Sequence, residues 1–167
     1  MILAILVIPK LMYGLESLWL RKVDTKRLDS FYVKCLRRVH GIKHAFWSRV
    51  SNLEVMATAG VQPLSRELLR RQLLLYGRFA SQPDFAVQRK SFLESSTVHP
   101  RSWKGRRKRG RPRQEWGTEV HKHALNIAGS DADLRVCLYD PKRWKRAVSA
   151  YCQNPPEQAA DGGAFSE

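Results

Sequence analysis

The residues of this chain best suited to chemistry are cationic, and they gather between Arg101 and Arg113. This run, RSWKGRRKRGRPR, holds eight Lys or Arg in thirteen residues and no acidic residue. Gly110 and Pro112 disfavour a stable helix, and a strand so densely charged would repel its neighbours. The pattern predicts an extended basic arm in solvent, and the chemistry open to it is ionic binding of a polyanion such as nucleic acid.

The centre of the arm, Arg109-Gly110-Arg111-Pro112, resembles the AT-hook. Its Gly lets the backbone approach the minor groove, its Pro fixes an extended path, and its Arg side chains suit the negative potential of narrow A-T tracts. A solvated linker or a nuclear-import signal is the alternative interpretation of the run. The arm residues expected to contact nucleic acid are Arg106, Arg107, Lys108, Arg109, Gly110, Arg111, Pro112 and Arg113.

Patterns of catalytic and metal sites are absent from the sequence. It has no Walker loop, GxSxG elbow or HExxH helix, and no carboxylate pair in a setting typical of metal-dependent phosphoryl transfer. On a helix His121 and His123 would point about 200° apart, so they cannot chelate one ion from that helix and are expected on the surface. His40 and His44 have the spacing of a metal pair, but Gly41 is expected to end their helix, and no third ligand is evident. We therefore predict no catalytic residue, no metal site and no cofactor.

The composition is that of a small, basic, globular protein. With 167 residues, 43% of them hydrophobic, the chain is long enough for one domain with appendages around a core. Its net charge of +15 and pI near 10.3 are typical of proteins that bind nucleic acid or an anionic surface. The charge is uneven, at +9 for residues 1–80, +8 for residues 81–113 and −2 for residues 114–167. Binding by charge is therefore expected in the first two of these parts.

Cysteine usage and hydropathy bear on the compartment. Cys35, Cys137 and Cys152 are an odd number without CxxC spacing, which argues against a disulfide framework and against a zinc knuckle. The apolar residues 1–8 lack a basic flank and a cleavage site, and Pro9 ends them far short of a membrane span. We predict an intracellular protein that is not secreted and has no membrane partner.

Apolar residues recur at helical spacing in five segments and show sustained alternation in none. The clearest helix is expected over residues 24–41, where Phe31 and Val39 are counted in the apolar stripe. Ser51 and Glu54 form a capping box, in which each side chain satisfies the other residue's backbone N–H. We predict a mainly α fold: short helices packed as a small bundle, a basic irregular linker, a small C-terminal helical pair and a disordered tail.

Four arginines on the predicted helices complete the expected nucleic-acid-binding set. Arg37 and Arg38 fall largely opposite the apolar stripe of the first long helix, and Arg70 and Arg71 lie away from the centre of the stripe of the next. An ordinary solvated face is the alternative interpretation of both. Gly77, near the end of the second helix, indicates close packing or helix termination.

A series of short motifs, each weak by itself, occurs in an order and spacing that resembles one family. They are Tyr13-Gly14-Leu15-Glu16-Ser17-Leu18-Trp19, Leu28 with Phe31, Cys35-Leu36-Arg37-Arg38, Gly41-Ile42, Ser51-Asn52-x-Glu54-Val55, Gly60, Pro63-Leu64-Ser65, Arg70-Arg71-Gln72-Leu73 with Tyr76-Gly77, the run from Arg107 to Arg113 with Trp116, and Arg143-Trp144-Lys145-Arg146. Together they resemble the part of the non-LTR retrotransposon reverse transcriptases that follows the polymerase palm, and the resemblance spans residues 5–148. Residues 81–113 show no sustained period and divide the chain into a helical region over residues 1–80, thumb-like by the resemblance, the linker with its arm over residues 81–113, a C-terminal helical segment over residues 114–152 and a tail over residues 153–167.

The resemblance implies a role in holding template and primer by their backbones, with upstream polymerase domains as the missing partners in a full-length relative. The family's palm carries an aromatic-Ala-Asp-Asp motif that holds two magnesium ions, and neither this motif nor the endonuclease occurs here. We therefore expect a catalytically incomplete C-terminal fragment that is not an enzyme on its own, binds DNA duplex, primer-template or RNA, and is nuclear. Where the family usually reads Gly-His, this chain has Gly77-Arg78. The alternatives are a host-adopted AT-hook-like DNA-binding protein and a relic reading frame without a selected function.

Overall fold

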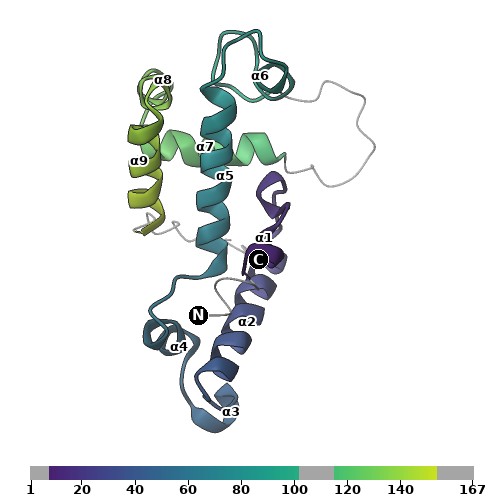
Figure 1. The fold of residues 1–167 in the computed structure, drawn as a ribbon, viewed down its shortest axis with the longest axis vertical. Helices are drawn as coiled ribbons and strands as arrows, with labels where there is room; N and C mark the ends of the chain where they lie inside the picture. Colours follow the sequence, from purple (N-terminus) through teal and green to yellow (C-terminus); the bar gives the residue numbers. More distant parts are fainter. Residues whose placement is uncertain (1–7, 102–114, 154–167) are drawn as a thin grey trace, which may run out of the picture.

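The computed structural model describes residues 8–101 and 115–153, and in these ranges the chain is helical, with no β-strand (Figure 1). The elements are α1 (Ile8–Met12), the 3-10 helix η2 (Leu15–Ser17), α2 (Lys22–Val39), α3 (Ala45–Ser48), α4 (Asn52–Thr58), α5 (Leu64–Ala80), α6 (Val87–Phe92), α7 (Trp116–Ala128), α8 (Asp131–Tyr139) and α9 (Pro141–Gln153). The prediction of a mainly α fold is confirmed. The predicted disordered tail and residues 106–113 of the basic arm lie outside the described residues.

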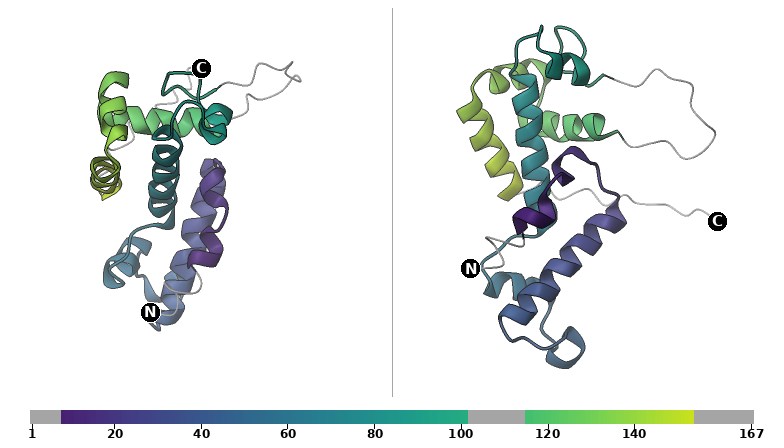
Figure 2. Two further views of the ribbon diagram at one scale, coloured as in Figure 1. Left: turned by 45° about the horizontal axis from the view of Figure 1, so that its top comes forward. Right: turned by 45° about the vertical axis from the view of Figure 1, so that its right-hand side comes forward.

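Helix α5 is the element that both halves of the described structure share. Its C-terminal half packs beside α7 and α9, while α2 and α4 lie toward its N-terminal end (Figures 1 and 2). Two hydrophobic cores follow from this arrangement, and the change from one to the other falls within α5, between Leu68 and Leu73. The first core lies wholly within the predicted region of residues 1–80, and α5 extends from it into the second core.

The first core forms where the apolar stripe of α2 meets α4 and the start of α5. Its buried residues are Met12, Leu28, Tyr32, Val33, Leu36, Val55, Leu64 and Leu68. The predicted capping box begins α4: Glu54 N–H donates to Ser51 Oγ, and Ser51 N–H donates to Glu54 Oε2. Two residues of the predicted stripe are not in this core, because Phe31 is 47% exposed and Val39 is 59% exposed.

Residues 81–101 are more ordered than the predicted irregular linker. They include α6, and an antiparallel bridge joins Leu93 to Pro100. The second core is made of the buried residues Leu73, Tyr76, Ala80, Leu93, Val98, Val120, Ala124, Leu134, Cys137, Leu138, Trp144, Val148 and Cys152. Leu93 and Val98 of this segment are therefore buried with Tyr76 and Val120. The segment was expected to be irregular because its apolar residues have no regular period, yet their burial holds it against α5 and α7.

The C-terminal segment contains three helices where a pair was expected. Gly129, at φ 87°, ends α7, and the Ser130 side chain then caps α8 by accepting a hydrogen bond from Asp133 N–H. Leu134 and Leu138 on this short helix are buried in the second core. The predicted helices on either side of it correspond to α7 and α9.

Helices α5 and α9 meet closely at Gly77. A Cβ built at this position would overlap the indole ring of Trp144, which is buried and donates from Nε1 to Leu73 O at 3.0 Å. Of the two interpretations of Gly77, close packing is therefore the one that the structure bears out. Within the described ranges, no helix is both long enough and apolar enough to cross a membrane.

Candidate nucleic-acid interface and a histidine–aspartate cluster

Arg37 differs from its predicted position on the solvent face of α2. Arg37 is only 6% exposed. Its guanidinium donates to Lys43 O, Ser48 Oγ, Val50 O and Asn52 Oδ1 at 2.6 to 3.3 Å. The first three acceptors belong to the segment that connects α2 to α4, and Asn52 is the first residue of α4. Arg37 therefore holds this connection onto α2, and its donors are not directed to a ligand.

The outer face of α2 carries an exposed basic surface, which we call the α2 face. It is made of Val23, Lys26, Arg27, Ser30, Phe31 and Lys34, which line a shallow surface depression, together with the exposed Arg38. Each residue of this set has another member three or four positions away, the spacing that places side chains on one side of a helix. Arg38 lies as predicted on the solvent side, and the exposed ring of Phe31 lies among the cations.

Arg70 and Arg71 share one carboxylate on α5. Arg70 donates from Nε and Nη2 to the two Glu67 oxygens at 2.7 and 2.9 Å, and Arg71 donates from Nε to Glu67 Oε1 at 3.0 Å. Burial alone would raise the pKa of Glu67, but the hydrogen bonds from both arginines lower it below the ordinary value. The three side chains are about 70% buried. The trio carries one net positive charge, so it offers less to a phosphate than two free arginines would.

The predicted arm residues Arg106 to Arg113 lie outside the described residues, whereas the start of the basic run at Arg101 is described. Arg101, the first cation of the run, is exposed, and its N–H donates to Phe92 O at 2.9 Å. This bond continues the pairing of Leu93 with Pro100. The arm therefore starts from a segment that is packed on the second core.

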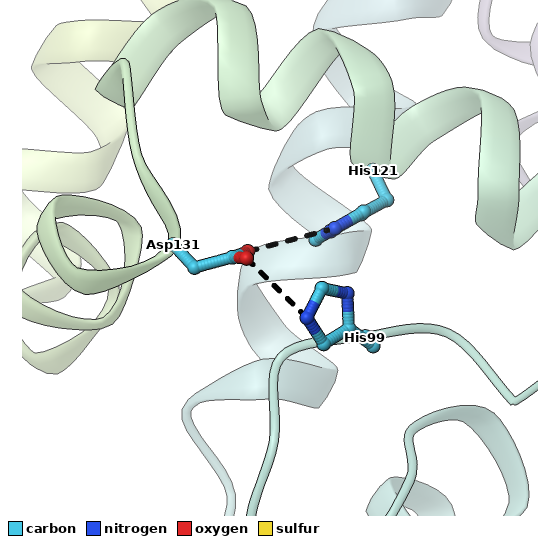
Figure 3. Close-up of side chains that lie close together, drawn as sticks. All are labelled: His99, His121 and Asp131. Atoms are coloured by element: carbon cyan, nitrogen blue, oxygen red, sulfur yellow. Dashed lines mark ion pairs between the residues drawn. The ribbon is translucent and has the colours of Figure 1, made fainter.

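Three side chains from distant parts of the chain form a histidine–aspartate cluster on the same core: His99, His121 and Asp131 (Figure 3). His99 lies between α6 and the arm, His121 lies on α7, and Asp131 is the first residue of α8. Asp131 Oδ2 is 3.3 Å from His99 Nε2, and Asp131 Oδ1 is 3.8 Å from His121 Nε2. The second distance is too long for a hydrogen bond, so the buried atoms His121 Nε2 and Asp131 Oδ1 have no hydrogen-bond partner.

Tyr76 sets the orientation of His121. The Tyr76 hydroxyl donates its one proton to Val98 O at 2.8 Å and lies 2.9 Å from His121 Nδ1. Since that proton is already used, the network assigns a proton to His121 Nδ1, which then donates to the hydroxyl oxygen. In neutral His121 the lone pair is therefore on Nε2, facing Asp131.

Burial dominates the ionisation of this network. It lowers the pKa of His121, and the nearby His99 lowers it further, against the opposing effect of Asp131. Burial, followed by the charge of Asp131, raises the pKa of Tyr76 well above its ordinary value. His121 is therefore neutral near pH 7 and Tyr76 keeps its proton.

The sequence interpretation of the α7 histidines was wrong in both cases. His121 is 7% exposed, next to buried Val120, and the half-buried His123 has Nδ1 at 3.0 Å from the Tyr151 hydroxyl. The two histidines have different neighbours, as their spacing on one helix predicts, but His121 meets His99 and Asp131 from other parts of the chain. No spacing signal connects His99, His121 and Asp131, because the fold alone brings them together.

Comparison of the chain with known proteins finds no relative. No protein-family model, curated protein or solved structure matches the chain.

Proposed function

We propose that the chain binds nucleic acid by its phosphate backbone, using the α2 face together with the basic arm. The observation that carries the proposal is the row Lys26, Lys34 and Arg38 beside the exposed ring of Phe31 on one side of α2. Among the residues that the structure describes, these three cations have no hydrogen-bonding or ionic partner. Such cations attract phosphate and release the counterions that surround a nucleic acid.

The α2 face favours a strand with accessible bases over a purely double-helical ligand. Phe31 is 47% exposed, and a base stacked on an aromatic side chain contributes about 1–3 kcal/mol without sequence preference. The cations on either side would hold the phosphates of the same strand. This combination suits a primer-template junction or single-stranded RNA, both of which present unpaired bases.

The resemblance to the post-palm part of non-LTR retrotransposon reverse transcriptases supports the same ligand. On this proposal the chain is a catalytically incomplete fragment that holds template and primer, is not an enzyme on its own, and in a full-length relative works beside upstream polymerase domains. A nuclear location is part of the proposal, since the ligand and the import-like basic run both favour it. The Arg109-Gly110-Arg111-Pro112 sequence favours the second candidate, an AT-hook-like protein that prefers A-T duplex.

Two charge-matched double variants test the proposal. The first is Lys34→Ala with Arg38→Ala on the α2 face, and the control is Arg143→Ala with Lys145→Ala, which are exposed on α9. Affinities for a primer-template DNA with a single-stranded overhang are measured by fluorescence anisotropy between 50 and 200 mM salt. If both α2 cations contact phosphate, the slope of log K against log salt falls by about 1.5 in magnitude, and the control leaves it within about 0.5.

The same assay separates the candidates. Adding Phe31→Ala should weaken binding to the overhang by about 1–3 kcal/mol while leaving blunt duplex unaffected. Equal effects of the two double variants would rule out the α2 face. A preference for blunt A-T duplex over the overhang, lost in Arg111→Ala, would support the AT-hook-like candidate in its place.

A further inference from the structure

We propose that His99, His121 and Asp131 form a binding site for a divalent transition-metal ion, and that Zn²⁺ fits the donor set best. The side chains point toward one another from three separate segments (Figure 3), and their donor atoms all lie within 4.8 Å of one another. Two imidazole nitrogens and one carboxylate oxygen are a known ligand set for Zn²⁺, with water as the fourth ligand. The site is separate from the α2 face and does not depend on nucleic-acid binding.

The donor atoms, which lie within 4.8 Å of one another, are somewhat farther apart than in an occupied tetrahedral site, so ion binding would draw them together. Bonds of about 2.1 Å at tetrahedral angles place neighbouring donors roughly 3.4 Å apart. Asp131 Oδ2 lies 3.3 Å from His99 Nε2, and Asp131 Oδ1 lies 3.8 Å from His121 Nε2. The remaining adjustment falls to His99, whose side chain is 51% exposed and is not in a helix.

The unpaired atoms of the cluster point to a cation. His121 Nε2 and Asp131 Oδ1 are buried, face each other, and have no hydrogen-bond partner. The hydrogen bonds of Tyr76 leave a lone pair on His121 Nε2, so both facing atoms are acceptors. Buried polar atoms are nearly always paired, and an ion between these two would satisfy both. The His121 side chain, 8% exposed, is aimed at the place where the ion would lie.

Tyr76 provides the outer contact that ligating histidines usually have. A metal-bound histidine normally donates its other ring N–H to a fixed acceptor, which holds the ring in orientation. Here His121 Nδ1–H donates to the Tyr76 hydroxyl, which in turn donates to the carbonyl of Val98, the residue before His99. One buried side chain therefore positions both histidine ligands.

An ion at this site would join three parts of the second core: α7, the start of α8, and the segment that precedes the arm. His99 is two residues before Arg101, the first cation of the basic run. The ion would thus fix the backbone from which the arm starts. This effect on the arm rests on the proposed function, whereas metal binding itself does not.

The test uses the full chain without an affinity tag, since tags of histidine bind zinc. Zn²⁺ affinity is measured by competition with a chromophoric chelator, and Co²⁺ serves as a spectroscopic probe. We expect one ion per chain and the visible bands of four-coordinate Co²⁺, without a thiolate-to-cobalt charge-transfer band. His99→Ala and Asp131→Asn should each weaken Zn²⁺ binding by about 100-fold or more, and Tyr76→Phe by about 10- to 100-fold. His40→Ala, which removes the exposed histidine directly after α2, should leave the affinity unchanged.

Either of two results would contradict the proposal. One is Zn²⁺ binding by His99→Ala and Asp131→Asn as tight as that of His40→Ala, which would leave the cluster as a partly buried ion pair. The other is a thiolate charge-transfer band, which would assign binding to the cysteines. Both replaced ligands are partly exposed, so folding should persist, and circular dichroism checks this. The Co²⁺ spectrum of the wild type distinguishes thiolate from imidazole and carboxylate ligands without any variant.

Discussion

Replacement of Gly77 by Ala tests the packing of α5 against α9, on which the second core depends. A Cβ at this position overlaps Nε1 and Cδ1 of the Trp144 indole, and Trp144 is only 3% exposed. The ring has no open space to enter, so Gly77→Ala must displace it or separate the two helices. Either response also strains the bond from Trp144 Nε1 to Leu73 O.

The expected loss follows from three contributions. Overpacking in a core costs about 1–3 kcal/mol. Breaking the Trp144 bond leaves the buried indole N–H unpaired, which costs about 1–3 kcal/mol more. Ala regains about 1 kcal/mol over Gly in helix propensity. We therefore expect Gly77→Ala to lower the free energy of unfolding by about 3 kcal/mol.

Urea denaturation followed by circular dichroism measures this loss. Arg78→Ala, at the exposed neighbouring position, is the control and should change the free energy of unfolding by less than about 0.5 kcal/mol. In a Trp144→Phe background, the loss caused by Gly77→Ala should shrink by more than about 0.5 kcal/mol, because the smaller ring leaves room for the Cβ. A Gly77→Ala variant that is more stable than the wild type, or a zero coupling with Trp144, would refute the reasoning.

Three further predictions concern the buried Arg37, the paired Glu67 and the lack of polymerase activity. Arg37→Ala should lower the free energy of unfolding by about 2–4 kcal/mol, since four acceptors lose their donor; Arg38→Ala is the control, and equal small losses in urea denaturation would contradict the buried role. The lowered pKa of Glu67 means that its contribution to stability is present above its unfolded-state value of 4.5 and is lost as pH falls through the folded-state value. Thermal unfolding of Glu67→Gln should therefore depend less on pH below about 5 than that of the wild type, and parallel profiles would argue against the pairing with Arg70 and Arg71. The purified chain should extend no primer with magnesium or manganese, and template-dependent nucleotide incorporation above a buffer blank would overturn that expectation.

The helices could be predicted from the sequence because their signals are local. The capping box of Ser51 and Glu54, the apolar periods, and the glycines at helix ends act over one or two turns. The exposure of Phe31 and Val39 could not be predicted, because the period shows which side of a helix is apolar but not how far a neighbouring helix covers that side. Phe31 is 47% exposed, and Val39, the last residue of α2, is 59% exposed.

The candidate sites depended on contacts between distant residues. The sequence around Arg37 is like that around a solvent-exposed arginine. Arg37 is buried because the chain after α2 folds back and offers four acceptors to its guanidinium. Likewise, His99, His121 and Asp131 meet because α7 and α8 turn at Gly129 and the residues after α6 pack on α5. Neither arrangement has a sequence signature, so both required the structure.

The central claim, that this chain binds nucleic acid through its phosphates, is tested most directly by the salt dependence of binding. The measurement is the Kd of the full wild-type chain for a primer-template DNA, determined at several salt concentrations between 50 and 200 mM. If about six cations of the α2 face and the arm reach phosphates, log K should fall against log salt with a slope near −5, a loss of about a thousandfold over this range. A Kd that does not change with salt, or no binding at 50 mM, would contradict the account.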